Sequence, residues 1–110
     1  MKIRNGFVSN SSSSSFIITN KSDKNLTLVD FVKENPQLIE EWNSQYGYNN
    51  TQEELLESAT KNNFTFQADS SHEYEFGDES GTLIGRVFDY ILRDGGYSEN
   101  FKWKFFKYYR

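Results

Sequence analysis

The alternation of apolar and polar positions predicts several short β-strands. Phe16-Ile17-Ile18-Thr19 is a β-rich run bounded by polar residues. Apolar and polar side chains also alternate over 64–68, 73–76 and 101–105, as they do in strands with one buried face. The few polar residues between 64–68 and 73–76 predict that these two strands form a hairpin. The alternation slips at Phe105-Phe106, which predicts a β-bulge.

Four other windows have the apolar spacing of amphipathic helices. We expect them to run from Thr27 to about Glu34, from Pro36 to about Tyr46, from Gln52 to about Lys61, and from Ser80 or Thr82 to Arg93. Thr27 and Thr51 are suitable N-cap residues, and Thr51 with Glu54 matches a capping box. Gly47 can close the second helix, and Gly95-Gly96 stops the fourth.

These elements predict an α+β fold with a small, mostly antiparallel sheet of three or four strands. Three or four helices are expected to pack on one face of that sheet. The 110 residues fit one domain, which we place at 16–110, preceded by a Ser-rich N-terminal arm at 1–15. Ten Phe, seven Tyr and two Trp residues supply large buried areas for a core of this size.

The composition excludes several classes of site. The chain has no cysteine, so a disulfide framework, a zinc–thiolate site and a cysteine nucleophile are impossible. Lys2 and Arg4 are followed by serines where a signal peptide needs an apolar core, and no apolar stretch is long enough to span a bilayer. We therefore expect a soluble protein without cofactors.

Charge is unevenly distributed along the chain. Formal charge is +3 over 1–24, −11 over 25–99 and +4 over 100–110. The basic ends either pair with the acidic body or form a second functional face. Pairing is favoured, because the C-terminal basic segment also has the pattern of a strand.

One acidic cluster could carry chemistry: Glu73, Glu75, Asp78 and Glu79. Such oxygens could bind a hard cation, or two of them could act as an acid/base pair. The spacing does not match a helix-loop-helix calcium loop, and the neighbouring His72 is the only histidine. The favoured interpretation is the solvated face of a half-buried strand, and we do not expect an enzyme.

The C-terminal segment alternates basic and aromatic residues. Lys102, Lys104 and Lys107 could form a basic surface beside exposed rings that stack on single-stranded nucleic acid. We favour a structural role in which Phe101, Trp103 and Phe105 are buried and the lysines lie in water. The net charge of −4 argues against general nucleic-acid affinity.

Five consecutive serines, Ser11 to Ser15, are the least expected feature of the chain. A serine run hides little apolar surface and competes with secondary structure for backbone hydrogen bonds. It could be a tail, a phosphorylated segment or an ordered arm that contacts a partner. The candidate binding residues of such an arm are Phe7, Val8, Asn10, Ser11, Ser13, Ser15 and Phe16.

The segment from Arg4 to Phe16 resembles the opening of a group of small bacteriophage and bacterial proteins. These proteins begin with a basic stretch followed by Gly-Phe-Val-Ser-Asn-Ser-Ser-Ser-Ser-Ser-Phe, which matches residues 6–16 here. The resemblance covers about an eighth of the chain. It implies a phage or phage-like origin, and it implies no activity.

The sequence therefore favours a non-enzymatic phage accessory protein that binds a host or phage protein, as an inhibitor or modulator. Its expected location is the cytoplasm of the bacterial host. One alternative is a virion component whose N-terminal arm docks on a neighbouring subunit. Another is a metal-binding or catalytic protein that uses the cluster from His72 to Glu79.

Overall fold

A computed structural model describes residues 13–77 and 82–109. Its helices and strands are, in chain order, β1 (Ser13–Asn20), β2 (Leu26–Thr27), α1 (Leu28–Glu34), α2 (Gln37–Tyr46), α3 (Gln52–Lys61), β3 (Thr65–Phe66), β4 (Ser70–Gly77), α4 (Leu83–Ile91), the 3-10 turn η2 (Leu92–Asp94), β5 (Gly96–Tyr97) and β6 (Phe101–Tyr109). The α+β class predicted from the sequence is confirmed.

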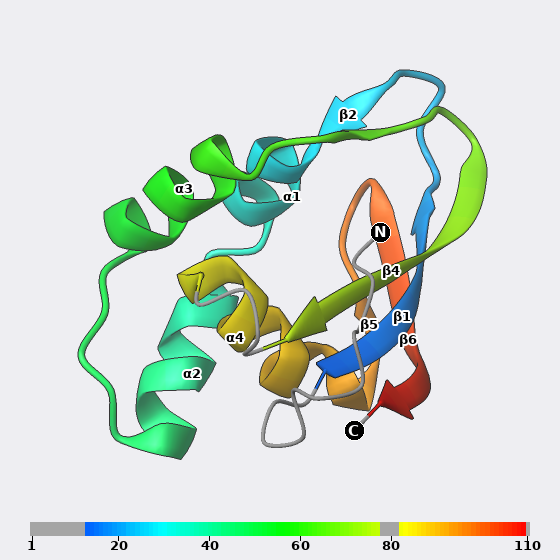
Figure 1. Ribbon diagram of the computed structural model, residues 1–110. Coiled ribbons are helices and arrows are strands. Elements are labelled where there is room, and N and C mark those ends of the chain that lie inside the picture. The colour runs from blue at the N-terminus through cyan, green and yellow to red at the C-terminus, as the bar shows by residue number, and fades with distance from the viewer. Residues whose placement is uncertain (1–12, 78–81, 110) are drawn as a thin grey trace.

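The main sheet has four antiparallel strands in the order β4-β1-β6-β5 (Figure 1). The strand that comes first in the chain, β1, is therefore central and pairs along its whole length with β4 and β6. It begins at Ser13, earlier than the strand predicted at Phe16. Ser13–Ser15, which the sequence analysis placed in the arm, thus belong to the sheet.

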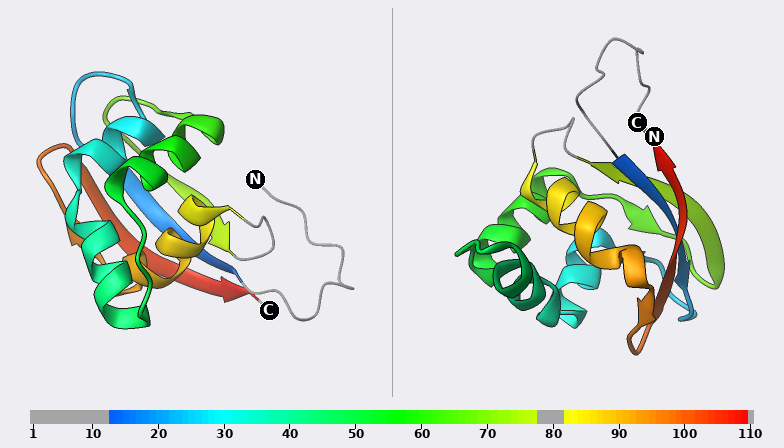
Figure 2. Two further views of the ribbon diagram at one scale, coloured as in Figure 1. Left: turned by 90° about the vertical axis from the view of Figure 1, so that its left-hand side faces the viewer. Right: turned by 90° about the horizontal axis from the view of Figure 1, so that it is seen from below.

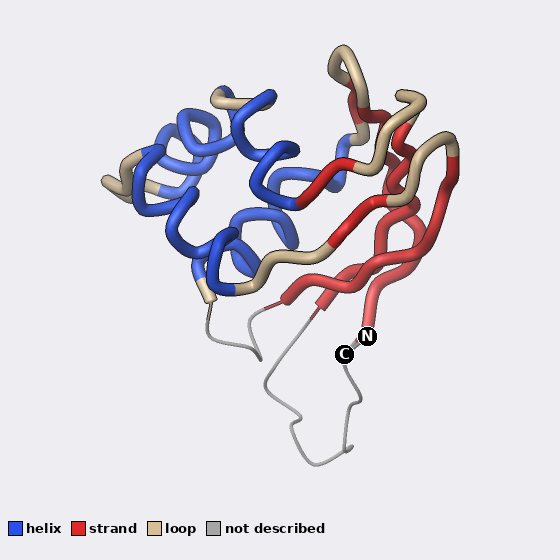
Figure 3. The backbone as a smooth tube through the Cα atoms, turned by 90° about the horizontal axis from the view of Figure 1, so that it is seen from above, coloured by secondary structure: helices blue, strands red, loops and turns tan. Residues whose placement is uncertain are grey.

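The molecule has two layers, with the helices on one face of the sheet (Figures 2 and 3). Even-numbered residues of β1 point toward the helices, so Phe16 and Ile18 are buried. The odd-numbered Ile17 and Thr19 lie on the opposite face and are half-buried. Within residues 13–77 and 82–109, no helix covers that opposite face.

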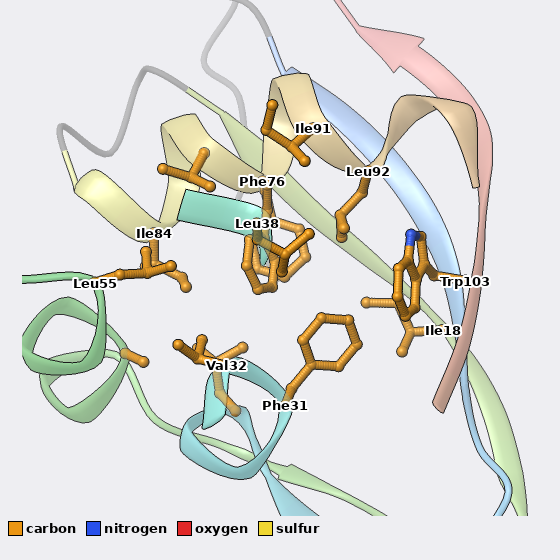
Figure 4. Close-up of a cluster of buried hydrophobic side chains, with 14 of the residues drawn as sticks. Ile18, Phe31, Val32, Leu38, Leu55, Phe76, Ile84, Ile91, Leu92 and Trp103 are labelled. Atoms are coloured by element: carbon orange, nitrogen blue, oxygen red, sulfur yellow. The ribbon is translucent and has the colours of Figure 1, made fainter. Parts of the chain in front are cut away.

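The core lies between the layers and is centred on Phe31 of α1 (Figure 4). The Phe31 ring lies within 6 Å, centroid to centroid, of four other aromatic rings, those of Phe66, Phe88, Phe101 and Trp103. These rings come from three elements: Phe66 from β3, Phe88 from α4, and Phe101 and Trp103 from β6. One helix side chain therefore joins both layers.

The helix boundaries follow the predicted capping signals. Thr27 accepts a hydrogen bond from the Asp30 amide, and the Asp30 carboxylate accepts one from the Thr27 amide, which completes a capping box. Thr51 and Glu54 form a second one at α3. Thr82 caps α4, and Gly47 ends α2 with φ 72°, a conformation that favours glycine.

The predicted hairpin between 64–68 and 73–76 is wrong. β3 pairs with β2 in a separate two-stranded sheet, and β4 pairs with β1. The connection turns away at Asp69, which has φ 50° and whose amide donates to the Ser22 carbonyl. A local pattern shows that both segments are extended, but it carries no information about partners distant in sequence.

The predicted bulge is confirmed. The β1–β6 register shifts where Phe16 lies opposite Phe105 and Ser15 lies opposite Lys107, so Phe106 is the extra residue. Phe101 and Trp103 are buried as predicted, whereas Phe105 is 40 % exposed.

Candidate protein-binding surface

The structure places only part of the predicted arm. Phe7, Val8, Asn10 and Ser11 lie outside the described residues. Ser13 begins β1. Ser15 and Phe16 are both buried in β1, and the Phe16 ring packs against Phe76 and Phe105. Ser15 and Phe16 therefore have a structural role in this chain.

The neighbouring Ser14 makes the polar contact that explains part of the serine run. It is fully buried on the helix side of β1, and its hydroxyl donates to the Asp89 Oδ1 atom at 2.7 Å. Asp89, on α4, is also fully buried and accepts from the Arg93 guanidinium at 3.1 Å. A larger apolar side chain at position 14 would remove the donor that Ser14 supplies to the buried Asp89 carboxylate, and this loss would destabilise the fold.

The acidic cluster is only partly described. Glu73 and Glu75 lie on the outer face of β4, whereas Asp78 and Glu79 lie outside the described residues. The Ser15 hydroxyl donates to Glu73 Oε2 at 2.5 Å. Within the described part of the chain, no group of three or more acidic, histidine or cysteine side chains could hold a metal ion.

The three predicted surface lysines lie together. Lys102, Lys104 and Lys107 are exposed on β6, opposite Thr19, Ile17 and Ser15 of β1. Glu73 and Glu75 lie opposite Ile17 and Ser15 on the other side of the same strand. The sheet face thus has an acidic column and a basic column separated by β1.

Glu34 joins the end of α1 to the turn that precedes β6. Its carboxylate accepts hydrogen bonds from the Ser98 hydroxyl, the Asn100 amide at 2.7 Å and the Asn100 side chain at 2.8 Å. Burial alone would raise the pKa of Glu34. These hydrogen bonds and the charge of Lys21 outweigh burial and lower the pKa of Glu34 below the usual value of a glutamate.

Glu34 should therefore make folding sensitive to acid. Because the pKa of Glu34 is lower in the folded state than in the unfolded state, Glu34 stabilises the folded protein at pH values above its unfolded-state pKa. This contribution is lost as pH falls through the folded-state pKa. Glu34→Gln should cost about 1–2 kcal/mol at pH 7. In urea titrations, the wild type should lose more stability between pH 7 and pH 3 than Glu34→Gln does. The exposed Glu53→Gln serves as control, and equal losses in wild type and Glu34→Gln would contradict the assignment.

Four aromatic side chains form a partly exposed surface that we name the aromatic patch: Trp42, Tyr46, Tyr48 and Tyr90. Tyr48 lies parallel to Trp42 with ring centroids 4.5 Å apart, and Tyr90 stacks on Trp42 at 5.9 Å. Tyr46 lies 5.2 Å from Tyr90. Trp42 is buried, whereas Tyr46 and Tyr48 are 44 % and 48 % exposed. The buried indole thus supports two tyrosines that face solvent.

Hydrogen bonds hold the loop that carries Tyr48. The Asn43 side chain donates to the Asn50 carbonyl at 2.7 Å and accepts from the Asn50 amide at 2.9 Å. The Trp42 indole donates to Asn50 Oδ1 at 2.9 Å. These hydrogen bonds tie Asn50, at the end of the loop, to α2 and so hold the loop in place, which lowers the entropy cost of binding.

The chain segment that carries Trp42, Tyr46 and Tyr48 is acidic. The segment from Gln37 to Lys61, which includes α2 and α3, has five acidic residues and one basic residue. On the other side, the Arg93 guanidinium lies 4.9 Å from the centre of the Tyr90 ring and pairs with Asp89. A partner surface that complements this region would be basic.

Two further clefts are formed by other parts of the described chain. One of about 400 Å³ runs beside β4 and includes Phe64, Tyr74 and Glu75; burial raises the pKa of Tyr74. The other, of about 370 Å³, lies between α3 and the start of α4, and its lining includes Asn50, Lys61, Arg86, Glu54 and Glu57. The opposite charges in the second cleft balance, so it favours neither anions nor cations.

The sequence analysis did not single out the aromatic patch. Tyr46 follows Trp42 by four positions, a spacing that places both on one helix face. That spacing is the signal that could have revealed the pair. Tyr90 comes from α4, and only the packing of α4 against α2 brings it to the same surface.

None of the described helices is both long and apolar enough to cross a membrane. The resemblance of residues 4–16 to phage proteins remains an expectation, and inference about function rests on the surfaces described above. No protein-family model, curated protein or solved structure matches this chain.

Proposed function

We propose that this chain is a non-enzymatic accessory protein of a phage, which binds a host or phage protein through the aromatic patch. The observation that carries the proposal is the pair of exposed tyrosines, Tyr46 and Tyr48, supported by the buried Trp42. Tyrosine and tryptophan are enriched among the residues that dominate binding energy at protein interfaces.

Charge favours a protein partner with a basic contact surface. Glu40 and Glu41 lie on α2 with Trp42, and Glu53 and Glu54 begin α3. These carboxylates would repel nucleic-acid phosphates and attract lysine and arginine side chains. Arginine also stacks well on tyrosine faces. The phage origin rests on the resemblance of the N-terminal segment.

The test is affinity capture from infected bacteria with full-length protein as bait. The double variant Tyr46→Ala/Tyr48→Ala should lose at least about nine-tenths of a specifically captured partner, as expected for two interface anchors. Because both rings are only about half exposed and pack on Trp42, this variant should lose some stability, and its circular dichroism spectrum must show that it is folded. Purified partner and protein should then bind directly, more weakly at high salt.

Tyr97→Ala is the matched control, because Tyr97 is an exposed tyrosine on β5, outside the aromatic patch. This variant should capture the partner as well as the wild type does. Equal capture by the double variant would reject the aromatic patch as the binding surface. Covalent modification or cleavage of the captured protein by substoichiometric amounts of this chain would show turnover and so contradict the non-enzymatic role.

A further inference from the structure

A third cleft, of about 310 Å³, lies between the first half of α2, the end of α4 and the turn that leads into β5. Its lining includes Glu41 of α2, Asp94 of η2, Gly96 and Tyr97 of β5, and Trp103 of β6. We name it the Trp103 cleft. None of the four residues of the aromatic patch is among its described lining residues. Its volume is near the lower end of the range for ligand pockets, so it suits one small group.

Trp103 brings a hydrogen-bond donor to this cleft. Only 6 % of Trp103 is exposed, yet its indole N–H has no acceptor within residues 13–77 and 82–109. The ring edge that carries Nε1 lies against Gly96, where an added Cβ atom would be 2.8 Å from Cζ2 and 3.2 Å from Nε1. Figure 4 shows this nitrogen at the end of the ring that points away from Ile18. Since a buried indole N–H usually has a partner, an oxygen atom of a ligand would complete this site.

Two carboxylates make the Trp103 cleft acidic. Glu41 and Asp94 both line it, and none of its described lining residues is basic. Neither carboxylate makes a hydrogen bond or an ion pair within the part of the chain that the structure describes. Lys21 lies 5.6 Å from the centre of the Tyr97 ring but does not line the cleft. The charge of the cleft therefore favours a cationic ligand.

The indole and the carboxylates together narrow the chemistry of that ligand. A metal ion does not fit, because an indole N–H is a donor and cannot coordinate a cation. A ligand with both an oxygen acceptor and a cationic group can use all three side chains. A guanidinium suits the cationic position better than a compact ammonium, because its planar fork can donate to two carboxylates and can stack on a tyrosine ring.

We propose that the Trp103 cleft binds a small molecule that carries a guanidinium group and a carbonyl oxygen, the chemistry of arginine derivatives. The carbonyl oxygen accepts from the Trp103 indole, and the guanidinium pairs with Glu41 and Asp94. Both carboxylates are exposed, so each ion pair contributes little and binding is weak, with a Kd on the order of 1 mM. The Trp103 cleft and the aromatic patch share no described residue, so either can bind without the other.

Nuclear magnetic resonance of the full chain tests the proposal through the indole N–H signals of its two tryptophans. The probe is Nα-acetyl-L-arginine amide, added up to about ten times the expected Kd. The Trp103 signal should move downfield and saturate, as on forming a hydrogen bond. The Trp42 signal should stay in place, because that indole already donates to Asn50. A Trp103 signal that does not move would overturn the proposal.

Two further probes test the chemistry of the ligand. Nα-acetyl-L-citrulline amide keeps the shape and the carbonyl groups but has an uncharged urea in place of the guanidinium. It should bind at least about tenfold more weakly than the arginine probe, and equal binding would overturn the role of charge. A blocked Gly-Gly-Arg-Gly-Gly peptide should bind no more tightly than the arginine probe. A tenfold gain would overturn the small molecule and indicate an arginine residue of a polypeptide.

A pair of double variants tests the position of the site. Glu41→Gln/Asp94→Asn should weaken binding of the arginine probe at least about tenfold. Glu40→Gln/Glu53→Gln changes the net charge equally at exposed positions that do not line the cleft, and should bind like the wild type. Circular dichroism checks that both variants are folded. Unchanged binding by the first variant, or an equal loss in the second, would overturn the assignment of the site.

Discussion

Phe31→Ala is expected to lower the free energy of unfolding by about 3–5 kcal/mol. Phe31 is fully buried, and its ring contacts rings from β3, α4 and β6. The substitution removes these contacts and leaves a cavity between the layers that surrounding strands can only partly fill. A domain of this size is typically stable by about 5–15 kcal/mol, so the variant should be near the limit of folding.

Urea denaturation followed by tryptophan fluorescence measures this loss, because Trp103 lies 5.1 Å from Phe31, ring centre to ring centre. Phe106→Ala is the matched control: Phe106 is 53 % exposed and should change stability by less than about 0.5 kcal/mol. Phe31→Leu keeps most of the volume and should fall between the two. A loss below about 1 kcal/mol for Phe31→Ala would show that the core is not centred on this ring.

Ser14→Ala is expected to cost about 1.5–3 kcal/mol, the range for a hydrogen bond to a charged group. The alanine side chain fits the same space, so the loss comes from the missing donor to Asp89 rather than from packing. Both residues are fully buried, and water cannot replace the hydroxyl without rearrangement.

Ser44→Ala is the control for this substitution. Ser44 lies exposed on α2, where alanine is the better helix former, so its replacement should be neutral or slightly stabilising. The double variant Ser14→Ala/Asp89→Asn separates the contact from other effects. If the stability loss of the double variant equals the sum of the losses of Ser14→Ala and Asp89→Asn, the hydrogen bond between Ser14 and Asp89 contributes nothing of its own.

The capping signals and the bulge could be predicted from the sequence because their causes are local. Thr27, Thr51 and Thr82 each accept from an amide three residues ahead, and this contact depends only on neighbouring positions. The slip at Phe105-Phe106 appears directly as a break in alternation. The α+β class follows from counting such elements.

The strand pairing and the serine run could not be assigned in this way. Ser14 and Asp89 are 75 positions apart, and a polar residue in a strand pattern indicates a solvent-facing site unless its partner is known. β4 pairs with β1 instead of the nearby β3, which an alternation pattern does not distinguish. The aromatic patch likewise depends on the packing of α4 against α2.

The central position of β1 has a consequence for synthesis on the ribosome. Its two neighbours are β4 and β6, and Ser13 pairs with both Gly77 and Tyr109. The nascent chain can form its helices early, because these depend on local contacts, but the sheet cannot close until residues 101–109 have left the exit tunnel. Until then, the edge of β1 that pairs with β6 is open to incorrect pairing, and the polar Ser13-Ser14-Ser15 segment makes this edge less prone to aggregate than an apolar strand would be.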